Sequence, residues 1–303
     1  MEHNERATYE VAVERLHQFE HLSELIQDSW LRKQHSKSVE QYSLITGWLT
    51  TSADDWKWTY SKYTKLLDSA INALKQIKDR NLWNKLSSKI RAPSNRAESK
   101  SVLAEIALAL FLIDYGIPFG METKLDPTSS KDVDFWLKLG NSEDVYVEMQ
   151  CLTESDASQR TSRVSAMHGG IPIRITDKDF EDEGDRILGK IFDKTPKLVE
   201  DKITFVGLDC TAIPEHGGIG LGTIPDALSR VFGQDNLELT ESGKKVRQLV
   251  DGVIWFQIDF DNALRPVKRG YFLNEHSAHF CKPGLVRWIE LWTNSNLQEC
   301  EAE

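Results

Sequence analysis

The chain has few of the features that mark membrane or secreted proteins. Its longest apolar run, IALALFLI, is too short to span a bilayer, and its polar start, MEHNERATYE, has no signal-peptide core. The four cysteines form no CxxC pair, and they predict reduced thiols in a cytoplasmic protein. We therefore expect a soluble cytoplasmic protein. A length of 303 residues with 40% hydrophobic residues suits a globular chain with a substantial core.

Several common functional motifs are missing. The chain has no GxSxG elbow and no HExxH helix, so the common hydrolase classes receive no support. The glycine-rich stretch HGGIGLG lacks the GxGxxG order and the lysine of a phosphate-binding loop, and it predicts a loop before a helix at Pro225. His276, His279 and Cys281 lack a fourth zinc ligand at the usual spacing, so we interpret them as ordinary loop residues.

The pattern of apolar residues divides the chain into two parts. Residues 1–80 are expected to be entirely helical, because apolar side chains recur there at helical spacing. These positions are Ala12, Leu16, Phe19, Leu22, Ile26 and Trp30, then Trp56, Tyr60, Tyr63, Leu67, Ile71, Leu74 and Ile77. Ser52 is expected to cap the helix formed by the second group of positions. The stretch WKWTYSKYTK resembles a stacking surface for nucleic acid, but its aromatic stripe favours a core position.

Residues 81–303 alternate predicted helices and strands, which indicates an α/β core. The strands expected after the first hairpin are ITFVGLDCT, GVIWFQIDF and GYFLN. The fold class is therefore a mixed α+β sheet flanked by helices, with an N-terminal all-helical region. The segment KIRAPSNRAESKS, around Pro93, is interpreted as the junction between the two parts.

Three carboxylates lie on segments that direct them toward a common place. Glu105 opens the apolar helix AEIALALFLIDYG, Asp134 begins the strand DFWLKL, and Glu148 lies in the strand VYVEMQ. Side chains alternate along a strand, so Glu148 and Gln150 share one face. The short polar linker GNSED predicts a hairpin that places Asp134 opposite these two residues. Gathered carboxylates repel one another, so such a fold usually binds a hard cation.

These segments resemble the PD-(D/E)XK, or restriction-endonuclease-like, nuclease superfamily. The resemblance covers about Leu82 to Thr211 and is carried by SVLAEIALALFLIDYGIPF, SSKDVDFWLKL, DVYVEMQCL and DRILGKIFDKTPKLVEDKITFVGLD. It implies that Glu105, Asp134 and Glu148 are the acidic site residues, and that the protein is an endonuclease with DNA as the expected substrate. The resemblance fails at one position, because the lysine of the family motif is Gln150 here.

The missing lysine changes the expected chemistry. Gln150 is neutral and cannot act as a base or a cation, although its amide can hydrogen-bond a water molecule. Lys190 and Lys194 are spaced i,i+4 on the following predicted helix, so both could face the site and replace the lost charge. Pro196 leaves the course of the chain after that helix open.

The expected mechanism is metal-assisted cleavage of a phosphodiester. Asp134, Glu148 and the backbone carbonyl of Met149 would hold Mg²⁺, or Mn²⁺ in its place, and Glu105 would hold a second ion or a water molecule. The sequence is compatible with two alternatives. The first is a catalytically impaired nuclease-fold module that binds nucleic acid or a protein partner. The second is a small-molecule hydrolase that uses the same metal site.

The predicted contacts to nucleic acid come from local basic segments, because the chain as a whole carries a formal net charge of −10. The segment from Arg80 to Lys100 holds six basic residues against the single acid Glu98. Arg160, Arg163 and Arg174 form a looser second group. The alternative interpretation is that each of these residues is a solvated surface charge. A homodimer, or a protein partner bound through the helical region, is also compatible with the sequence.

Overall fold

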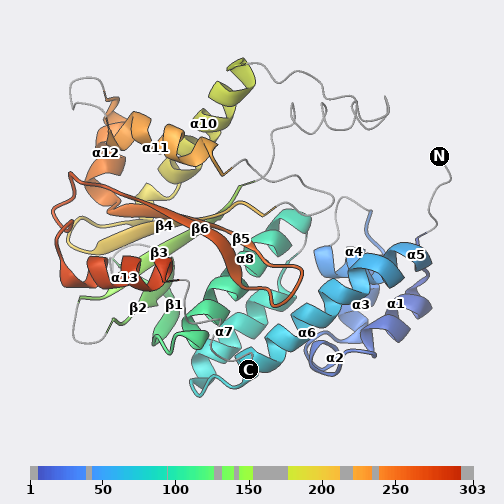
Figure 1. Cartoon of the computed structure of the whole chain (residues 1–303). Helices are drawn as coiled ribbons and strands as arrows, with labels where there is room; N and C mark the ends of the chain where they lie inside the picture. Colours follow the sequence, from blue (N-terminus) through green and yellow to red (C-terminus); the bar gives the residue numbers. More distant parts are fainter. Residues whose placement is uncertain are drawn as a thin grey trace. The chain divides into compact units, whose positions relative to one another are not determined.

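The structure, a computed structural model, describes residues 6–38, 43–93, 95–125, 132–139, 143–152, 177–211, 221–233 and 239–294 (Figure 1). It forms two compact units. The first unit comprises Met1–Asp114 and Ile258–Pro266, and the second comprises Tyr115–Gln257 and Val267–Glu303. The first unit therefore extends beyond the boundary drawn from the sequence near residue 80, and it includes a short segment between two consecutive strands.

The first unit is built from helices, which confirms the predicted N-terminal helical region. The helices are α1 (Tyr9–Leu16), α2 (Glu20–Leu25), α3 (Asp28–His35), α4 (Leu44–Thr50), α5 (Ala53–Asp55), the π-helix η1 (Trp56–Tyr60), α6 (Ser61–Lys75), α7 (Arg80–Arg91) and α8 (Arg96–Asp114). Ser52 caps α5 as expected, because its hydroxyl accepts the amide of Asp55 over 3.2 Å.

The apolar positions from Ala12 to Trp30 do not lie on one helix but on the three short helices α1 to α3. The break before α2 is stabilised from a distant part of the chain. No side chain of the preceding residue, Phe19, caps this helix. Instead the Asp68 carboxylate, on α6, accepts the amide of Leu22 in the first turn over 2.7 Å. A cap supplied by tertiary structure leaves no local signal in the sequence.

The aromatic stripe of WKWTYSKYTK is packed, as its spacing predicts, and Trp58 lies outside that stripe. Tyr60 is buried, and Tyr63 contacts the rings of Trp48 and Phe260 with centroids 5.8 and 4.9 Å apart. Trp58 is 76% exposed. It lies in the middle of η1, where the wider π-helical turn changes the angular spacing of the side chains.

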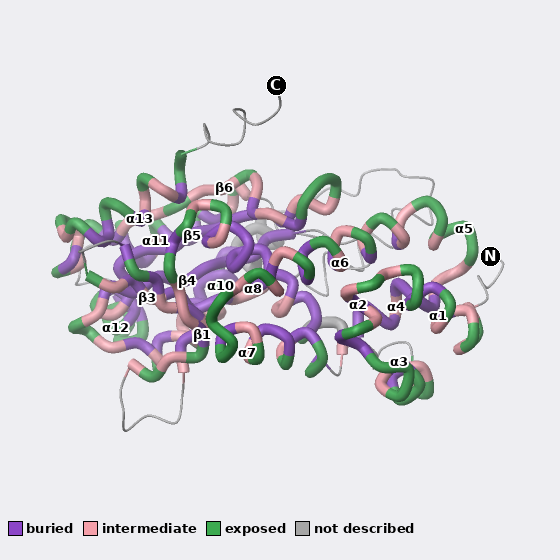
Figure 2. Tube along the Cα trace, turned by 90° about the horizontal axis from the view of Figure 1, so that it is seen from below, coloured by how far each residue is buried: buried purple, intermediate pink, exposed green. Residues whose placement is uncertain are grey.

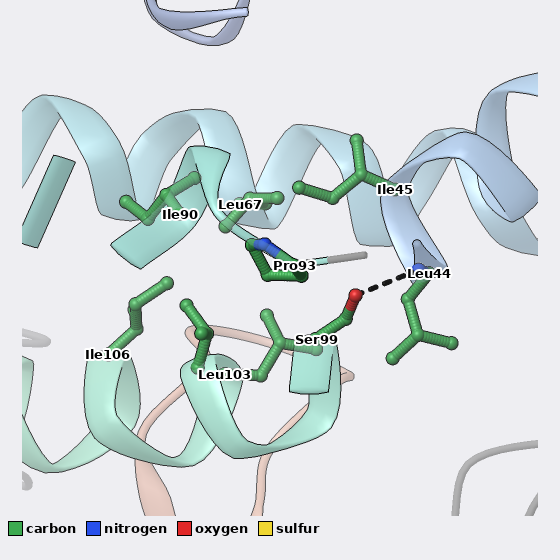
Figure 3. A pocket seen from close by; sticks show the side chains of 9 residues that line it. Leu44, Ile45, Leu67, Ile90, Pro93, Ser99, Leu103 and Ile106 are labelled. Carbon is green, nitrogen blue, oxygen red and sulfur yellow. Dashed lines mark hydrogen bonds between the residues drawn. The ribbon is translucent and has the colours of Figure 1, made fainter. Parts of the chain in front are cut away.

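A small apolar hollow lies within the first unit (Figure 3). Its only polar lining side chain, Ser99, already accepts the amide of Leu44 over 3.1 Å. The lining residues are Leu44, Ile45, Leu67, Ile90, Pro93, Ser99, Val102, Leu103 and Ile106. A hollow of this chemistry offers no hydrogen bond that would orient a polar ligand.

The second unit is organised around a six-stranded sheet of order β1-β2-β3-β4-β5-β6. The strands are β1 (Phe119–Thr123), β2 (Val133–Leu137), β3 (Val145–Cys151), β4 (Ile203–Asp209), β5 (Gly252–Ile258) and β6 (Pro266–Leu273). The first three strands are antiparallel, whereas β3, β4 and β5 are parallel. The mixed α/β sheet expected from the sequence is therefore confirmed.

Helices cover both faces of this sheet. Helices α10 (Asp177–Phe192), α11 (Thr223–Phe232) and α12 (Glu241–Leu249) share a hydrophobic core with Val206, Leu208 and Val253 on one face. Helix α13 (Pro283–Thr293) lies on the other face (Figure 1). There Trp292 meets Phe256 edge to face. The inner strands β4 and β5 are almost completely buried, and the edge strand β6 is partly exposed (Figure 2). Within the described residues, no helix is both long and apolar enough to cross a bilayer.

Candidate active site

Asp134 and Glu148 lie opposite each other on the hairpin formed by β2 and β3. The regular pairing of the two strands runs from Leu137↔Val145 to Phe135↔Val147. At the next position, where Asp134 lies opposite Glu148, the carboxylates of these two residues take part in the hydrogen bonding between the strands. The amide of Asp134 donates to Glu148 Oε2 over 3.2 Å, and the amide of Met149 donates to Asp134 Oδ2 over 2.8 Å. Each carboxylate is thus held by the backbone of the opposite strand.

Glu148 is buried, with no exposed surface, and two ammonium groups approach one of its oxygens. Lys194 Nζ lies 2.7 Å and Lys197 Nζ 2.5 Å from Glu148 Oε1. Burial raises the pKa of Glu148 above its ordinary value, and the nearby charge of Asp134 acts in the same direction. The two lysines oppose this shift in the pKa. They supply the compensation that a buried carboxylate needs.

Lys197 was not among the residues predicted from the sequence. Lys194 follows the end of α10, and the chain then forms the 3-10 turn η2 (Thr195–Lys197). Pro196 lies in the first turn of η2, four residues after the end of α10, and this turn carries Lys197 back to Glu148. The presence of a lysine directly after this proline was the available signal.

Lys190 and Gln150 lie close to this group along the chain but take other positions. Lys190 is half-buried on α10 and makes no ion pair with Asp134 or Glu148 in the described part of the chain. The side-chain amide of Gln150 donates to the carbonyl oxygen of Cys151 over 3.1 Å. One donor of Gln150 is therefore already used, and its side-chain carbonyl oxygen retains the capacity to accept.

Glu105 belongs to the first compact unit, and the other predicted site residues belong to the second. It is buried on α8, where its Oε2 atom accepts Lys89 Nζ over 2.6 Å. The group that the structure assembles in the second unit consists of Asp134, Glu148, Lys194 and Lys197.

The residues around Asp134 fit a hard divalent cation. The carboxylates of Asp134 and Glu148 and the carbonyl of Met149 are oxygen donors of the kind that Mg²⁺ prefers. One side-chain oxygen of Asp132, two residues before Asp134, is buried and has no hydrogen-bond partner. Such an orphaned acceptor fits a cationic group that would satisfy it.

Another acidic group lies in the first unit. Among the described residues, Glu20, His21 and Glu24 bring three potential metal-ligating atoms within 4.8 Å of one another. Lys75 already occupies this place, because its Nζ atom pairs with Glu24 and lies 3.4 Å from Nδ1 of His21. A cation there would have to displace an ammonium group.

The basic segment from Arg80 to Lys100 is not uniformly solvated. Arg80 and Arg91 are exposed on α7, but Lys89 pairs with Glu105 and Lys100 is only 2% exposed. The side chain of Arg96 is not described. Arg160, Arg163 and Arg174 lie outside the described residues, so the second basic group remains a prediction from the sequence.

The histidine proposed above as a loop residue is part of a buried network. His279 Nδ1 lies 3.0 Å from Asp251 Oδ1, and both side chains are buried. The Asp251 carboxylate also accepts the hydroxyl of Ser277 and the amide of Thr204. These bonds tie the residues after β6 to the starts of β4 and β5, and they give His279 a structural partner.

Comparison with protein-family models and with curated proteins found no match.

Proposed function

We propose that the chain is a metal-dependent nuclease that hydrolyses phosphodiester bonds in nucleic acid, with DNA as the first substrate to test. One observation carries the proposal. Two acidic residues from neighbouring strands, Asp134 and Glu148, face each other beside two lysines that would supply the charge missing at Gln150. Carboxylates for a cation and ammonium groups for a phosphate are the two requirements of this chemistry.

Residues of the second unit are assigned separate roles. Asp134, Glu148 and the carbonyl of Met149 would hold Mg²⁺ or Mn²⁺. When bound, the cation would stabilise negative charge on the phosphate and make the attacking water more acidic. Lys194 and Lys197 each use one contact to Glu148, and an ammonium group has three donors. Their remaining donors would bind the phosphate oxygens, and Gln150 would orient the water through its side-chain carbonyl.

A second function has one observation in its favour. Lys194 and Lys197 already neutralise Glu148, and the amide of Gln150 is bonded to the chain itself. A catalytically impaired module would retain such a group for stability alone. This module would still bind nucleic acid, and the exposed Arg80 and Arg91 on α7 are candidates for the phosphate contacts in either case.

The test is cleavage of supercoiled plasmid, single-stranded DNA and RNA with Mg²⁺ or Mn²⁺ added. Asp134→Asn and Glu148→Gln should abolish cleavage. Asp201→Asn is the matched control, because it removes a carboxylate that is 76% exposed in the same unit. Equal cleavage by wild type and both site variants would overturn the nuclease proposal. Binding of nucleic acid without cleavage by the wild type would favour the impaired module.

A further inference from the structure

Asp132 has an unusual environment for a carboxylate. Its Oδ1 atom is buried without a hydrogen-bond partner, and in the part of the chain that the structure describes it is the one carboxylate oxygen in this condition. The residue as a whole is half-buried. By contrast, carboxylates that are fully buried have donors. Asp251 accepts bonds from Thr204, Ser277 and His279, and Glu148 accepts bonds from two lysines and an amide.

The position of Asp132 relates this oxygen to the candidate active site. Asp132 lies one residue before β2 and two before Asp134. If the alternation of β2 continues one residue outward, both side chains lie on the same face. The register of β2 and β3 pairs Phe135 with Val147. Continued in the same register, it places Asp134 opposite Glu148 and Asp132 opposite Gln150.

Gln150, the residue that the extended register places opposite Asp132, makes no hydrogen bond to its Oδ1 atom. A lysine at position 150 would offer an ammonium group to Asp132. The chain has Gln150 instead, and its side-chain amide donates to the Cys151 carbonyl. A buried carboxylate oxygen without a donor is less favourable than a solvated one, because it has lost its hydrogen bonds to water. A bound cation would remove that penalty.

We propose that Asp132 is a further carboxylate ligand of the divalent cation, acting with Asp134 on the same strand. This inference rests on the proposed function, because it uses the same site. It adds a residue that the acidic motif of the sequence does not include. Because Gln150 is neutral, it cannot compensate the charge of Asp132. The bound cation would do so instead.

The test measures Mn²⁺ binding by titration calorimetry and by the loss of the free Mn²⁺ signal in electron paramagnetic resonance. Asp132→Asn should weaken Mn²⁺ binding on the order of tenfold or more, since cation affinity depends on the number of charged ligands. The same variant should unfold at an equal or higher temperature than wild type without divalent ions, because it removes an uncompensated charge. The rise in unfolding temperature caused by Mn²⁺ should shrink.

Two further variants keep the result interpretable. Asp201→Asn should bind Mn²⁺ like the wild type, because that carboxylate is largely exposed. Asp132→Glu retains the charge and should bind more tightly than Asp132→Asn, which provides a second measurement if the asparagine variant folds poorly. Mn²⁺ affinity unchanged in Asp132→Asn, or no Mn²⁺ binding by the wild type, would overturn the inference.

The outcomes separate this inference from the nuclease proposal. Loss of Mn²⁺ binding in Asp132→Asn supports the ligand role even if no nucleic acid is cleaved. If Asp134→Asn and Glu148→Gln lose Mn²⁺ binding but Asp132→Asn retains it, the proposed site stands and the role of Asp132 is refuted.

Discussion

The amide of Asp134 donates to the carboxylate of Glu148, so the strand that carries one acid also holds the other. The reciprocal bond runs from the amide of Met149 to Asp134. Backbone donors fix both carboxylates at the place where the regular strand pairing ends. A site built on strands and held by backbone bonds is pre-organised, because its ligands need little rearrangement when a cation or substrate arrives.

The first prediction concerns the two lysines at Glu148. Lys194→Met and Lys197→Met should each destabilise the fold modestly, because the other ammonium group still compensates the carboxylate. The double variant leaves a buried carboxylate without a cation and should lower the free energy of unfolding by about 3 kcal/mol or more. Urea unfolding measures the effect, with Lys190→Met as the control. Adding Glu148→Gln to the double variant should recover stability. The prediction would be contradicted if the double lysine variant lost only the sum of two small losses in the free energy of unfolding.

The second prediction concerns Glu105 and Lys89. Lys89→Met removes the ammonium group that lies 2.6 Å from the buried Glu105 carboxylate, and it should lower the free energy of unfolding by about 1–3 kcal/mol. Adding Glu105→Gln should restore part of the loss, because no buried charge then remains unpaired. Chemical unfolding of the two single variants and the double variant measures the coupling. If Glu105 acts mainly through this ion pair, the double variant should still bind Mn²⁺.

The third prediction concerns the pH dependence of the Asp251 network. Burial raises the pKa of Asp251 above its ordinary value of 3.8, although bonds from Ser277, Thr204 and His279 oppose the shift. The carboxyl group of Asp251 therefore stays protonated to a higher pH in the folded state than in the unfolded state. The contribution of Asp251 to stability is greatest below its ordinary pKa and declines as pH rises through the raised pKa.

Asp251→Asn tests this sign. The variant replaces one accepting oxygen by an NH₂ group that faces other donors, and it should lower the free energy of unfolding by about 1–3 kcal/mol at neutral pH. Its stability should also depend less on pH above 3.8 than that of the wild type. Unfolding free energies measured across the acidic range check both effects, and an unchanged pH profile would contradict the assignment.

The fourth prediction compares two glycines of the second unit. A Cβ atom at Gly189 would meet nothing within 4 Å, so Gly189→Ala on α10 should stabilise the protein by about 0.5–1 kcal/mol. A Cβ atom at Gly270 on β6 would overlap the indole of Trp255, so Gly270→Ala should destabilise the fold by about 1–3 kcal/mol. Thermal unfolding distinguishes the two variants. If both variants shifted the unfolding temperature in the same direction, the close packing of Gly270 against Trp255 would be refuted.

Local patterns in the sequence were sufficient for much of the fold. The alternation of side chains in VYVEMQ and the polar linker before it predicted the hairpin that places Asp134 opposite Glu148. Helical spacing predicted the all-helical start, and Ser52 marked a helix cap that the structure contains. These features depend on residues a few positions apart, so the sequence alone determined them.

The remaining features depend on pairs that are distant in the sequence. Lys197 reaches Glu148 across 49 positions, and Asp68 caps a helix 46 positions earlier in the chain. Lys89 partners Glu105 instead of remaining a solvated charge, and His279 joins Asp251. Residue spacing indicates which face of its own helix or strand a charge occupies. Only the packing of elements decides which opposite charge meets it, because burial makes an unpaired charge unfavourable and thereby selects the partner.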